Sequence, residues 1–233
     1  HYEMRGLWEL TRASRQPGFE HSAGYRLGLA LEVLVARHAD RVYVISDALG
    51  AFVQQQWGLD AHKISLLPNC INPDAILPAT AADVEPMTIG YAGSLIDYEG
   101  LDTLLDALAL LHQHGKAVQL LIVGDGESRA ELEVQMHSLG LAHAVQFFGR
   151  RSPEEAKDTL RRCALVCIPR KPYAVCKIVP PLKLVEALAL GKAVVVPNLP
   201  VFRDELGEAA PAFFFQAGDA YDLSRVIADA LED

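Results

Sequence analysis

Hydrophobic residues in the second half of the chain form short continuous runs that alternate with segments of helical spacing. The runs 88–93, 118–126, 144–149, 164–170, 193–198 and 212–216 predict strands, and the segments 100–115, 127–140, 152–163, 180–192 and the end of the chain from Asp219 predict helices. Such alternation predicts parallel strands joined by right-handed crossovers, and continuous apolar runs are typical of strands covered on both faces. This half therefore predicts an α/β domain with a Rossmann-like, doubly wound parallel sheet that binds its ligand at the carboxyl ends of the strands.

The first part of the chain carries similar patterns over shorter stretches. Apolar residues at 27, 31 and 34 have helical spacing, the run 41–46 predicts a short buried strand, and Asp47 is positioned to cap a helix over 48–58. Residues 62–74 predict another strand that runs into a turn rich in proline and asparagine. Residues 75–86 show no periodicity and predict a linker, which divides the chain into a domain over 1–74 and a second domain over 87–233.

The composition limits the class of protein. The 233 residues are 51% hydrophobic and 22% charged, which is typical of a globular protein with enough apolar residues for a core. No apolar run reaches the roughly 18–20 residues of a membrane span, and no leader marks secretion. The net charge of −9 argues against a general nucleic-acid-binding protein, because neutralisation of phosphates dominates such binding. Four cysteines lack the paired spacing of metal sites, so we expect reduced thiols in a cytoplasmic protein and no bound metal: Cys70, Cys163, Cys167 and Cys176.

Two loops that follow predicted strands carry residues suited to an anion. Gly93 and Ser94 form a small-residue turn in which backbone N–H groups can approach an anion, although an ordinary turn also needs small residues for packing. The sequence S-P-E-E at 152–155 predicts a capping box with proline at the first helical position. Arg150 and Arg151 are not needed for that cap and could face a ligand at the strand end.

The segment 168–183 is the strongest candidate for an anion site. It contains no acidic residue in a chain that is acidic overall, and it joins a strand end to a helix N-terminus, where anions are often bound. A fork-shaped arginine, lysines and free backbone N–H groups suit a phosphate or diphosphate, whereas a solvated basic loop is the alternative. The basic residues of the segment are Arg170, Lys171, Lys177 and Lys183.

Lys183 and Glu186 are three residues apart at the start of the predicted helix over 180–192 and share a face. The lysine could reach a phosphate while the carboxylate accepts hydrogen bonds from a ribose diol. The alternative is a surface ion pair worth a few tenths of a kcal/mol. We expect Leu182, Val185 and Ala189 to take the buried side of this helix.

Residues 180–198 resemble the donor-binding helix and the following strand of retaining glycosyltransferases of family 4, which have the GT-B fold. Residues 41–53 and 63–72 resemble the end of the first domain of that family and its hinge. Further blocks resemble the family in the same order, namely 90–108, 120–133, 145–160 and 165–171. The resemblance implies that the chain is the C-terminal half of a GT-B glycosyltransferase, preceded by an incomplete N-terminal, acceptor-side domain.

The resemblance implies a nucleotide-diphospho-sugar donor, most simply a UDP-sugar, and a glycan or lipid-linked acceptor at the inner face of the cytoplasmic membrane. It implies that Glu186 holds the ribose hydroxyls, that Lys183 lies near the diphosphate and that Arg170 helps to neutralise the diphosphate leaving group, without a metal. Lys183 and Arg170 are therefore the catalytic candidates. The donor-binding set implied in this way is Gly93, Ser94, Gly149, Arg150, Arg151, Lys183, Leu184 and Glu186, with the loop 149–151 against the base.

The sequence departs from the family at several positions. The family often has a glutamate eight residues before Glu186 near the donor sugar, and Ile178 stands there, so sugar recognition could pass to the loop 173–177. A phosphate-binding lysine often precedes the glycine of the first loop, but Glu99 occupies that place, so Arg170 and Lys183 would do more of that work.

The sequence "HYEMRG" at the start of the chain resembles the end of a strand whose partner strands are absent. In the family, a polar residue near this strand end faces the cleft. Glu3 or Arg5 is the candidate for that acceptor-side position.

Other functions compete with sugar transfer. A non-catalytic nucleotide-sugar-binding domain, or the partner subunit of a split enzyme, would keep the donor site alone. A sugar-nucleotide epimerase of the same fold should carry acidic residues in the basic loop, which has none. An NAD-binding domain is disfavoured because no complete G-x-G-x-x-G follows the first clear strand.

Overall fold

The computed structural model describes residues 1–72, 76–207 and 210–232, and its chain divides into two compact units. Unit 1 holds His1–Cys70, Pro172–Pro180 and Leu199–Gly207, and unit 2 holds Ile71–Lys171, Pro181–Asn198 and Glu208–Asp233. Two stretches from the second half of the sequence thus belong to unit 1. The predicted boundary at 74 and 75 lies outside the described residues.

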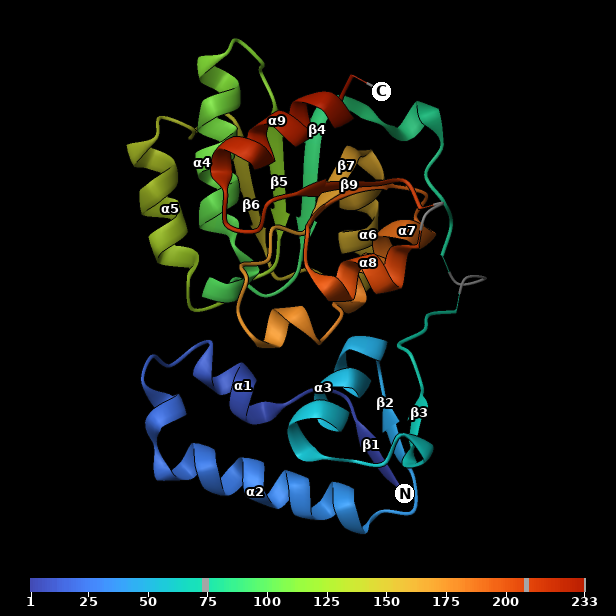
Figure 1. Ribbon diagram of the computed structural model, residues 1–233. Coiled ribbons are helices and arrows are strands. Elements are labelled where there is room, and N and C mark those ends of the chain that lie inside the picture. Colours follow the sequence, from blue (N-terminus) through green and yellow to red (C-terminus); the bar gives the residue numbers. More distant parts are fainter. Residues whose placement is uncertain (73–75, 208–209, 233) are drawn as a thin grey trace. The chain divides into compact units, whose positions relative to one another are not determined.

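Unit 2 contains one parallel sheet in the order β6-β5-β4-β7-β8-β9 (Figure 1). Its strands are β4 (Glu85–Ala92), β5 (Gln119–Val123), β6 (Val145–Gly149), β7 (Cys163–Cys167), β8 (Ala193–Pro197) and β9 (Ala212–Phe215). Its helices are α4 (Leu101–Gln113), α5 (Arg129–Ser138), α6 (Pro153–Arg162), α7 (Leu182–Ala189) and α9 (Ala220–Ala230). The strand order reverses direction at β4, from which the chain builds outward first through β5 and β6 and then through β7, β8 and β9. The predicted doubly wound parallel sheet is confirmed.

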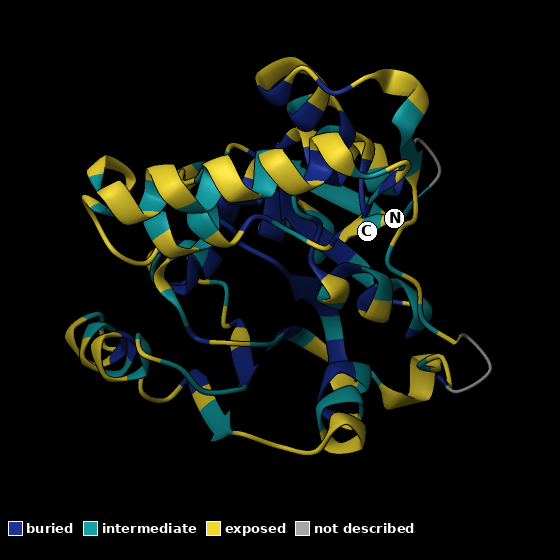
Figure 2. Cartoon of the chain, turned by 90° about the horizontal axis from the view of Figure 1, so that it is seen from below, coloured by how far each residue is buried: buried dark blue, intermediate teal, exposed yellow. Residues whose placement is uncertain are grey.

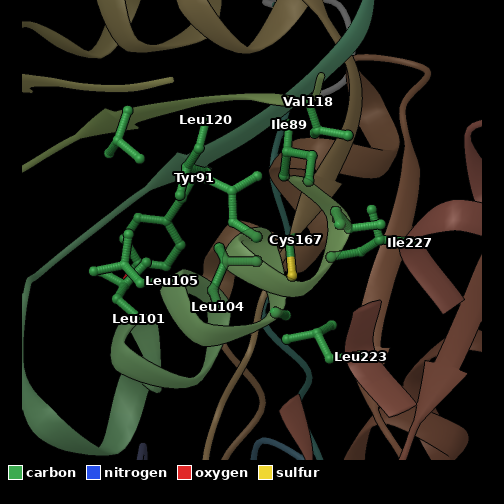
Figure 3. Packing of buried hydrophobic residues seen from close by; sticks show 14 of the residues in the cluster. Ile89, Tyr91, Leu101, Leu104, Leu105, Val118, Leu120, Cys167, Leu223 and Ile227 are labelled. Atoms are coloured by element: carbon green, nitrogen blue, oxygen red, sulfur yellow. The ribbon is translucent and has the colours of Figure 1, made fainter. Parts of the chain in front are cut away.

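The hydrophobic core of unit 2 lies between the sheet and the helices α4 and α9. Alternate residues of β4, Ile89 and Tyr91, point into this core and are fully buried. Figure 3 shows them packed with leucines of α4 and with Leu223 and Ile227 of α9. The other face of β4 is covered by α6, and a Cβ atom at Gly90 would lie 2.7 Å from the side chain of Leu160. Both faces of the central strand are therefore covered, as its apolar sequence predicts.

Unit 1 is built around a three-stranded parallel sheet in the order β1-β2-β3. Its strands are β1 (Tyr2–Met4), β2 (Val42–Val44) and β3 (Ile64–Leu66), and its helices are α1 (Trp8–Ala13), α2 (Ala23–His38), α3 (Asp47–Trp57) and α8 (Pro200–Leu206). The prediction that the strand at the start of the chain has no partner strands is wrong, because β1 pairs with β2 in parallel register. Figure 2 shows the contrast in burial along the chain, with buried residues in the strands and exposed residues on the outer faces of the helices.

The structure corrects two local predictions in unit 1. The N-cap of α3 is Ser46, whose hydroxyl accepts from the Leu49 N–H at 3.0 Å, and Asp47 is the first helical residue. The hydroxyl of Ser46 also donates to the Ile178 carbonyl at 2.6 Å, a contact that local sequence does not reveal. Helix α8 was not predicted between the strand runs 193–198 and 212–216, because its seven residues are too few to show a periodicity.

Local predictions for α6 and the cysteines are confirmed. Ser152 and Glu155 form the capping box, and Pro153 opens the helix. All four cysteines are free, and burial raises the pKa of the Cys163 thiol to about 12. Buried thiols of this kind are unreactive, because the thiolate is the nucleophile.

Candidate functional site

The most distinctive polar cluster of unit 2 lies where the strand order reverses, between β4 and β7. Glu99 belongs to a single 3-10 turn, Asp97–Glu99, in the loop after β4, and Arg170 follows β7. Lys183 lies in the first turn of α7. Because ligands of open α/β sheets bind at the carboxyl ends of strands at such a reversal, this is the expected place for a ligand.

Glu99 binds both predicted phosphate-contacting cations. Its Oε2 lies 2.6 Å from Lys183 Nζ, and its Oε1 lies 3.0 Å from Arg170 Nη2 and 3.3 Å from Arg170 Nε. Glu99 is 71 residues from Arg170 and 84 residues from Lys183 in the sequence. We name Glu99, Arg170 and Lys183 the switch-point cluster. Its two cations and one anion leave a net charge of about +1 at neutral pH.

The switch-point cluster is shielded from water. Glu99 is 3% exposed and Arg170 is 8% exposed, and Lys183 is partly buried. Burial raises the pKa of the Glu99 carboxyl, but Lys183 and Arg170 lower it more, so that it falls to about 2. The carboxylate is therefore ionised across the physiological range, and the pair interactions are much stronger than those at the surface.

Tyr91 and Glu99 hold the Lys183 ammonium group, and Gly93 and Gly100 allow close contacts around it. Lys183 Nζ donates to the Tyr91 hydroxyl at 2.9 Å, and this hydroxyl donates to the Ser94 carbonyl at 2.9 Å. A Cβ atom at Gly93 would lie 2.8 Å from Lys183 Nζ, and the φ of 156° at this position is one that residues with a side chain rarely adopt, so glycine suits the turn after β4. At Gly100, which has a φ of 75°, a Cβ atom would lie 2.0 Å from the carbonyl oxygen after β7. The loops after β4 and β7 are thus in direct contact.

Lys171 is neutralised by acidic residues of the same loop after β4. Its Nζ lies 2.6 Å from Asp97 Oδ1 and 2.8 Å from Asp102 Oδ2. Burial lowers the pKa of Lys171, but Asp102 and Asp97 raise it more. The segment 168–183 contains no acidic residue, as its sequence shows. In the folded protein, acidic side chains from 97–102 pair with its basic residues.

On helix α7, the side chain of Glu186 is exposed to solvent and that of Leu184 is buried. Glu186 is exposed and lies one turn after Lys183. Leu184 is 2% exposed, so its side chain belongs to the interior. The buried residues of the helix are Leu184 and Ala187, and Leu190 at the C-cap is buried as well. Of the predicted buried side, Val185 and Ala189 are half-buried, and the prediction for Leu182 is wrong, since that residue is 51% exposed.

The loop after β6 is exposed, in contrast to the switch-point cluster. Gly149 has a φ of 69°, a left-handed conformation that favours glycine, and Arg150 and Arg151 are both exposed. Arg151 Nη1 lies 3.8 Å from Glu155 Oε1, which is a weak surface ion pair. These arginines therefore remain accessible to a ligand.

In unit 1, Glu3 and Arg5 line a cavity of about 490 Å³ at the carboxyl end of β1. Arg5 Nε donates to Glu3 Oε1 at 2.8 Å, and the exposed indole of Trp8 forms part of the same wall. Tyr2 donates to Glu32 at 2.9 Å in this cavity. Burial and the hydrogen bond to the tyrosine act in opposite directions on the pKa of Glu32, and burial prevails, so the pKa is raised.

Ile178 is 8% exposed and belongs to the hydrophobic core of unit 1, together with Met4, Val44 and Leu49. Its side chain is packed among apolar residues, which is a physical reason for isoleucine at this position. The neighbouring loop 173–177 also belongs to unit 1.

Sequence reasoning missed the partners of the basic residues. The apolar run 88–93 predicts only a strand position for Tyr91, although its place two residues before Gly93 puts its hydroxyl at the strand end. The acidic residues in 97–102 are a second signal, because they follow the neighbouring strand of the sheet and therefore meet the basic loop at the same end of the sheet.

Among the described residues, no group of three or more histidine, cysteine, aspartate and glutamate side chains is arranged to hold a metal ion. Over the same residues, no helix has both the length and the apolar character to span a membrane.

Comparison with known families and proteins gives one consistent result. Residues 74–233 match the family described as "Glycosyl transferases group 1". A 2-deoxystreptamine glucosyltransferase of Streptomyces kanamyceticus is 22% identical over 216 residues, which cover 88% of this chain and 54% of that protein. A phosphatidyl-myo-inositol mannosyltransferase of Mycobacterium leprae is 30% identical over 191 residues, which cover 80% of this chain and 47% of that protein. The chain thus spans about half the length of these relatives.

Solved structures show the same fold. The structure of Anabaena HepE in complex with UDP matches with a TM-score of 0.80 at 22% identity, covering 100% of this chain and 62% of that chain. Sucrose-phosphate synthase of Thermosynechococcus elongatus also matches with a TM-score of 0.80 at 22% identity, covering 99% of this chain and 58% of that chain. The fold is that of GT-B glycosyltransferases, of which this chain resembles the C-terminal half.

Proposed function

The chain belongs to the family of glycosyl transferases group 1, and from this membership we propose that it transfers a sugar from a nucleotide-diphospho-sugar to a glycan or lipid-linked acceptor. We further propose that the anomeric configuration is retained, as the resemblance of residues 180–198 to retaining enzymes of family 4 implies.

The observation that carries this proposal is the convergence of Arg170 and Lys183 on the strand reversal between β4 and β7. Two cations from separate segments meet at the edge of the sheet where ligands of this architecture bind. The N-terminus of the eight-residue α7 adds backbone N–H groups and a favourable dipole for an anion. A diphosphate is the ligand that fits this combination of charge and position.

In the proposed reaction, the bond between the sugar and the diphosphate breaks and negative charge builds up on the leaving group. Arg170 and Lys183 stabilise that charge from a shielded position, where electrostatic interactions are strong. Glu186 accepts hydrogen bonds from the ribose diol, and Gly149, Arg150 and Arg151 lie against the base. Gly93 and Ser94 approach the diphosphate through the backbone. The two cations thereby carry the charge that a divalent metal carries in other sites of this chemistry.

A UDP-sugar is the donor that the comparisons favour. HepE of Anabaena was solved with UDP and with UDP-glucose, and its fold matches this chain with TM-scores of 0.80 and 0.78.

On the acceptor side, the proposal places Glu3 and Arg5 in the cavity of unit 1. The relatives include a phosphatidyl-myo-inositol mannosyltransferase of Mycobacterium leprae and an amylovoran biosynthesis glycosyltransferase of Erwinia amylovora. We therefore propose a cytoplasmic enzyme that works at the inner face of the membrane on a polysaccharide or lipid-linked acceptor.

Because the chain spans about half of its relatives, donor binding and transfer have to be tested separately. A thermal-shift screen of UDP, GDP and ADP with their glucose or mannose esters tests binding, since a ligand of the folded state raises the melting temperature by mass action. We expect UDP and a UDP-sugar to give the largest shifts. If none of these compounds raises the melting temperature, the donor site is wrong.

Release of the nucleoside diphosphate in the presence of candidate acceptors tests transfer. Sugar transfer predicts a glycosylated product. Binding without any product in the presence of acceptor extracts would indicate a non-catalytic donor-binding domain or one subunit of a split enzyme.

A further inference from the structure

We propose that Glu99 is a specificity-determining residue that limits the positive charge of the switch-point cluster. Two unopposed cations would strongly favour the free nucleoside diphosphate over the nucleotide sugar, and Glu99 reduces that preference. This inference rests on the proposed function of the cluster as a diphosphate site. It assigns a role to an acidic residue where the resembling family often has a lysine.

Glu99 is in direct contact with both cations of the proposed diphosphate site. Its two oxygens divide between Lys183 and Arg170, at 2.6 Å and 3.0 Å, and the residue is 3% exposed. A carboxylate this close to both cations lies within reach of any anion that they bind, so its charge opposes that anion directly. The same carboxylate provides the counter-charge that two shielded cations need while the site is empty.

The turn that carries Glu99 cannot move away easily. The turn Asp97–Glu99 ends at Gly100, whose backbone packs against the carbonyl of Pro169, where a Cβ atom would lie 2.0 Å away. The N–H of Lys171 also donates to the carbonyl of Tyr98 at 3.0 Å. The carboxylate is therefore held at the cluster by the backbone on both sides, and it acts on bound and free states alike.

Ligand charge turns this opposition into selectivity. A nucleoside diphosphate carries about one more negative charge at pH 8 than its sugar ester, because its terminal phosphate, with a second pKa near 6, is also ionised. Each unit of positive charge at the site favours the more highly charged ligand. Glu99 removes one such unit, and this reduces the preference for the product of transfer over its donor.

The test compares Glu99→Gln with the wild-type protein by titration calorimetry with UDP and UDP-glucose, and with GDP and GDP-mannose as a second pair. Glutamine keeps the shape and one acceptor oxygen but removes the charge. At pH 8 we expect UDP to bind roughly ten-fold tighter and UDP-glucose roughly three-fold tighter than in the wild type. At pH 5 the terminal phosphate has taken up its proton, so we expect the two gains to become equal.

A matched control and a second variant keep the result interpretable. Asp102→Asn makes the same change of charge beside Lys171 without touching Arg170 or Lys183, and it should leave the ratio of the two affinities unchanged. Ser94→Lys adds a cation at an exposed position beside the Tyr91–Lys183 contact while Glu99 stays in place, and it should favour UDP at pH 8 in the same direction. If Glu99→Gln does not fold, the absence of this shift in Ser94→Lys overturns the charge argument on which the role of Glu99 rests.

Each outcome is decisive. The inference is supported if Glu99→Gln increases the affinity for UDP more than the affinity for UDP-glucose at pH 8, and if this difference disappears at pH 5. Equal gains in the two affinities at both pH values, or weaker binding of UDP by the variant, overturn it. If the wild-type protein binds neither ligand pair, the proposed donor site and this inference both fail. If the wild type binds but the selective gain is missing, only the inference fails.

Discussion

The two basic loops of unit 2, after β6 and after β7, differ in what surrounds their arginines. Arg170 after β7 is 8% exposed and shares Glu99 with Lys183, whereas Arg150 and Arg151 after β6 are exposed and have at most a surface ion pair at 3.8 Å. In the sequence, both loops consist of a strand end followed by basic residues. The difference shows that charge density along a chain indicates where a ligand can bind but not how strongly each cation will act on it.

The largest expected effect comes from Lys183→Ala, which removes a shielded cation of the cluster. We expect the affinity for UDP to fall roughly 100-fold, because loss of a partner in a desolvated charge interaction costs about 2–5 kcal/mol. Uridine, which lacks phosphates, should bind almost as before. Calorimetry with both ligands checks this, and equal losses for UDP and uridine would contradict the phosphate role.

Acid titration separates the cluster from the exposed loop through stability. The folded pKa of Glu99, about 2, lies below its ordinary value of 4.5, so its ionised form stabilises the folded state above pH 4.5, and this contribution is lost as the pH falls toward 2. At about 1.4 kcal/mol for each tenfold change in proton affinity, the loss is on the order of 3 kcal/mol.

Urea unfolding of wild type and Glu99→Gln at pH 6, 4 and 3 measures this contribution as the difference between the two curves. Glu155→Gln, in the first turn of α6, is the surface comparison: the pKa of this exposed carboxyl is also lowered, through its hydrogen bonds with Ser152, and we expect a smaller flattening of the pH dependence. If the pH dependence of the free energy of unfolding were flattened equally in both variants, Glu99 in the shielded cluster would contribute no more than a surface carboxylate.

Glu186→Ala tests the exposed end of the site. We expect a loss of roughly ten-fold for UDP and for uridine alike, because both contain the ribose diol and each charged hydrogen bond contributes about 1.5–3 kcal/mol. Pyrophosphate should bind unchanged. A loss confined to UDP would place Glu186 beside the phosphates instead.

Ser152→Ala removes the cap of the helix that follows the exposed arginines. We expect the free energy of unfolding to fall by about 1 kcal/mol, because the Glu155 N–H and the start of α6 lose their partner. Ser138→Ala, which affects a hydroxyl in the last turn of α5, is the control and should change the stability by less than about half of that. Equal effects of the two substitutions would argue against the capping role.

Arg150→Ala and Arg151→Ala should have the smallest effects. We expect each to weaken UDP binding roughly two- to three-fold, since exposed charges contribute less than about 1 kcal/mol. The ratio of UDP to GDP affinity is the sensitive measure, because the loop is proposed to lie against the base. A loss as large as that of Lys183→Ala would remove the distinction between the two loops.

Local sequence patterns predicted what depends on neighbouring residues. The alternation of strands and helices from 88 onward, the capping box at Ser152 and the convergence of the loops at the strand ends all follow from periodicity and short-range spacing. Family resemblance added roles for Lys183 and Glu186 that spacing alone left open.

Long-range contacts could not be predicted in this way. Glu99 meets Arg170 across 71 residues, and Ser46 reaches the Ile178 carbonyl across 132 residues. Glu99 stands in the sequence where the resembling family often has a lysine. Its contact with both cations depends on the side-by-side pairing of β4 and β7, which only the folded sheet provides.

The division of the chain into its two units has a consequence for proteolysis. Residues 172–180 and 199–207 belong to unit 1 although they follow most of unit 2 in the sequence. Ile178 lies in the same hydrophobic core as residues of β1 and β2. A protease that cuts once near Cys70, where the chain first passes from unit 1 to unit 2, would sever the backbone, but the later fragment would still carry part of the hydrophobic core of unit 1. Such a nicked protein should therefore migrate as two bands in a denaturing gel and elute as one species under native conditions, held together in the manner of fragment complementation.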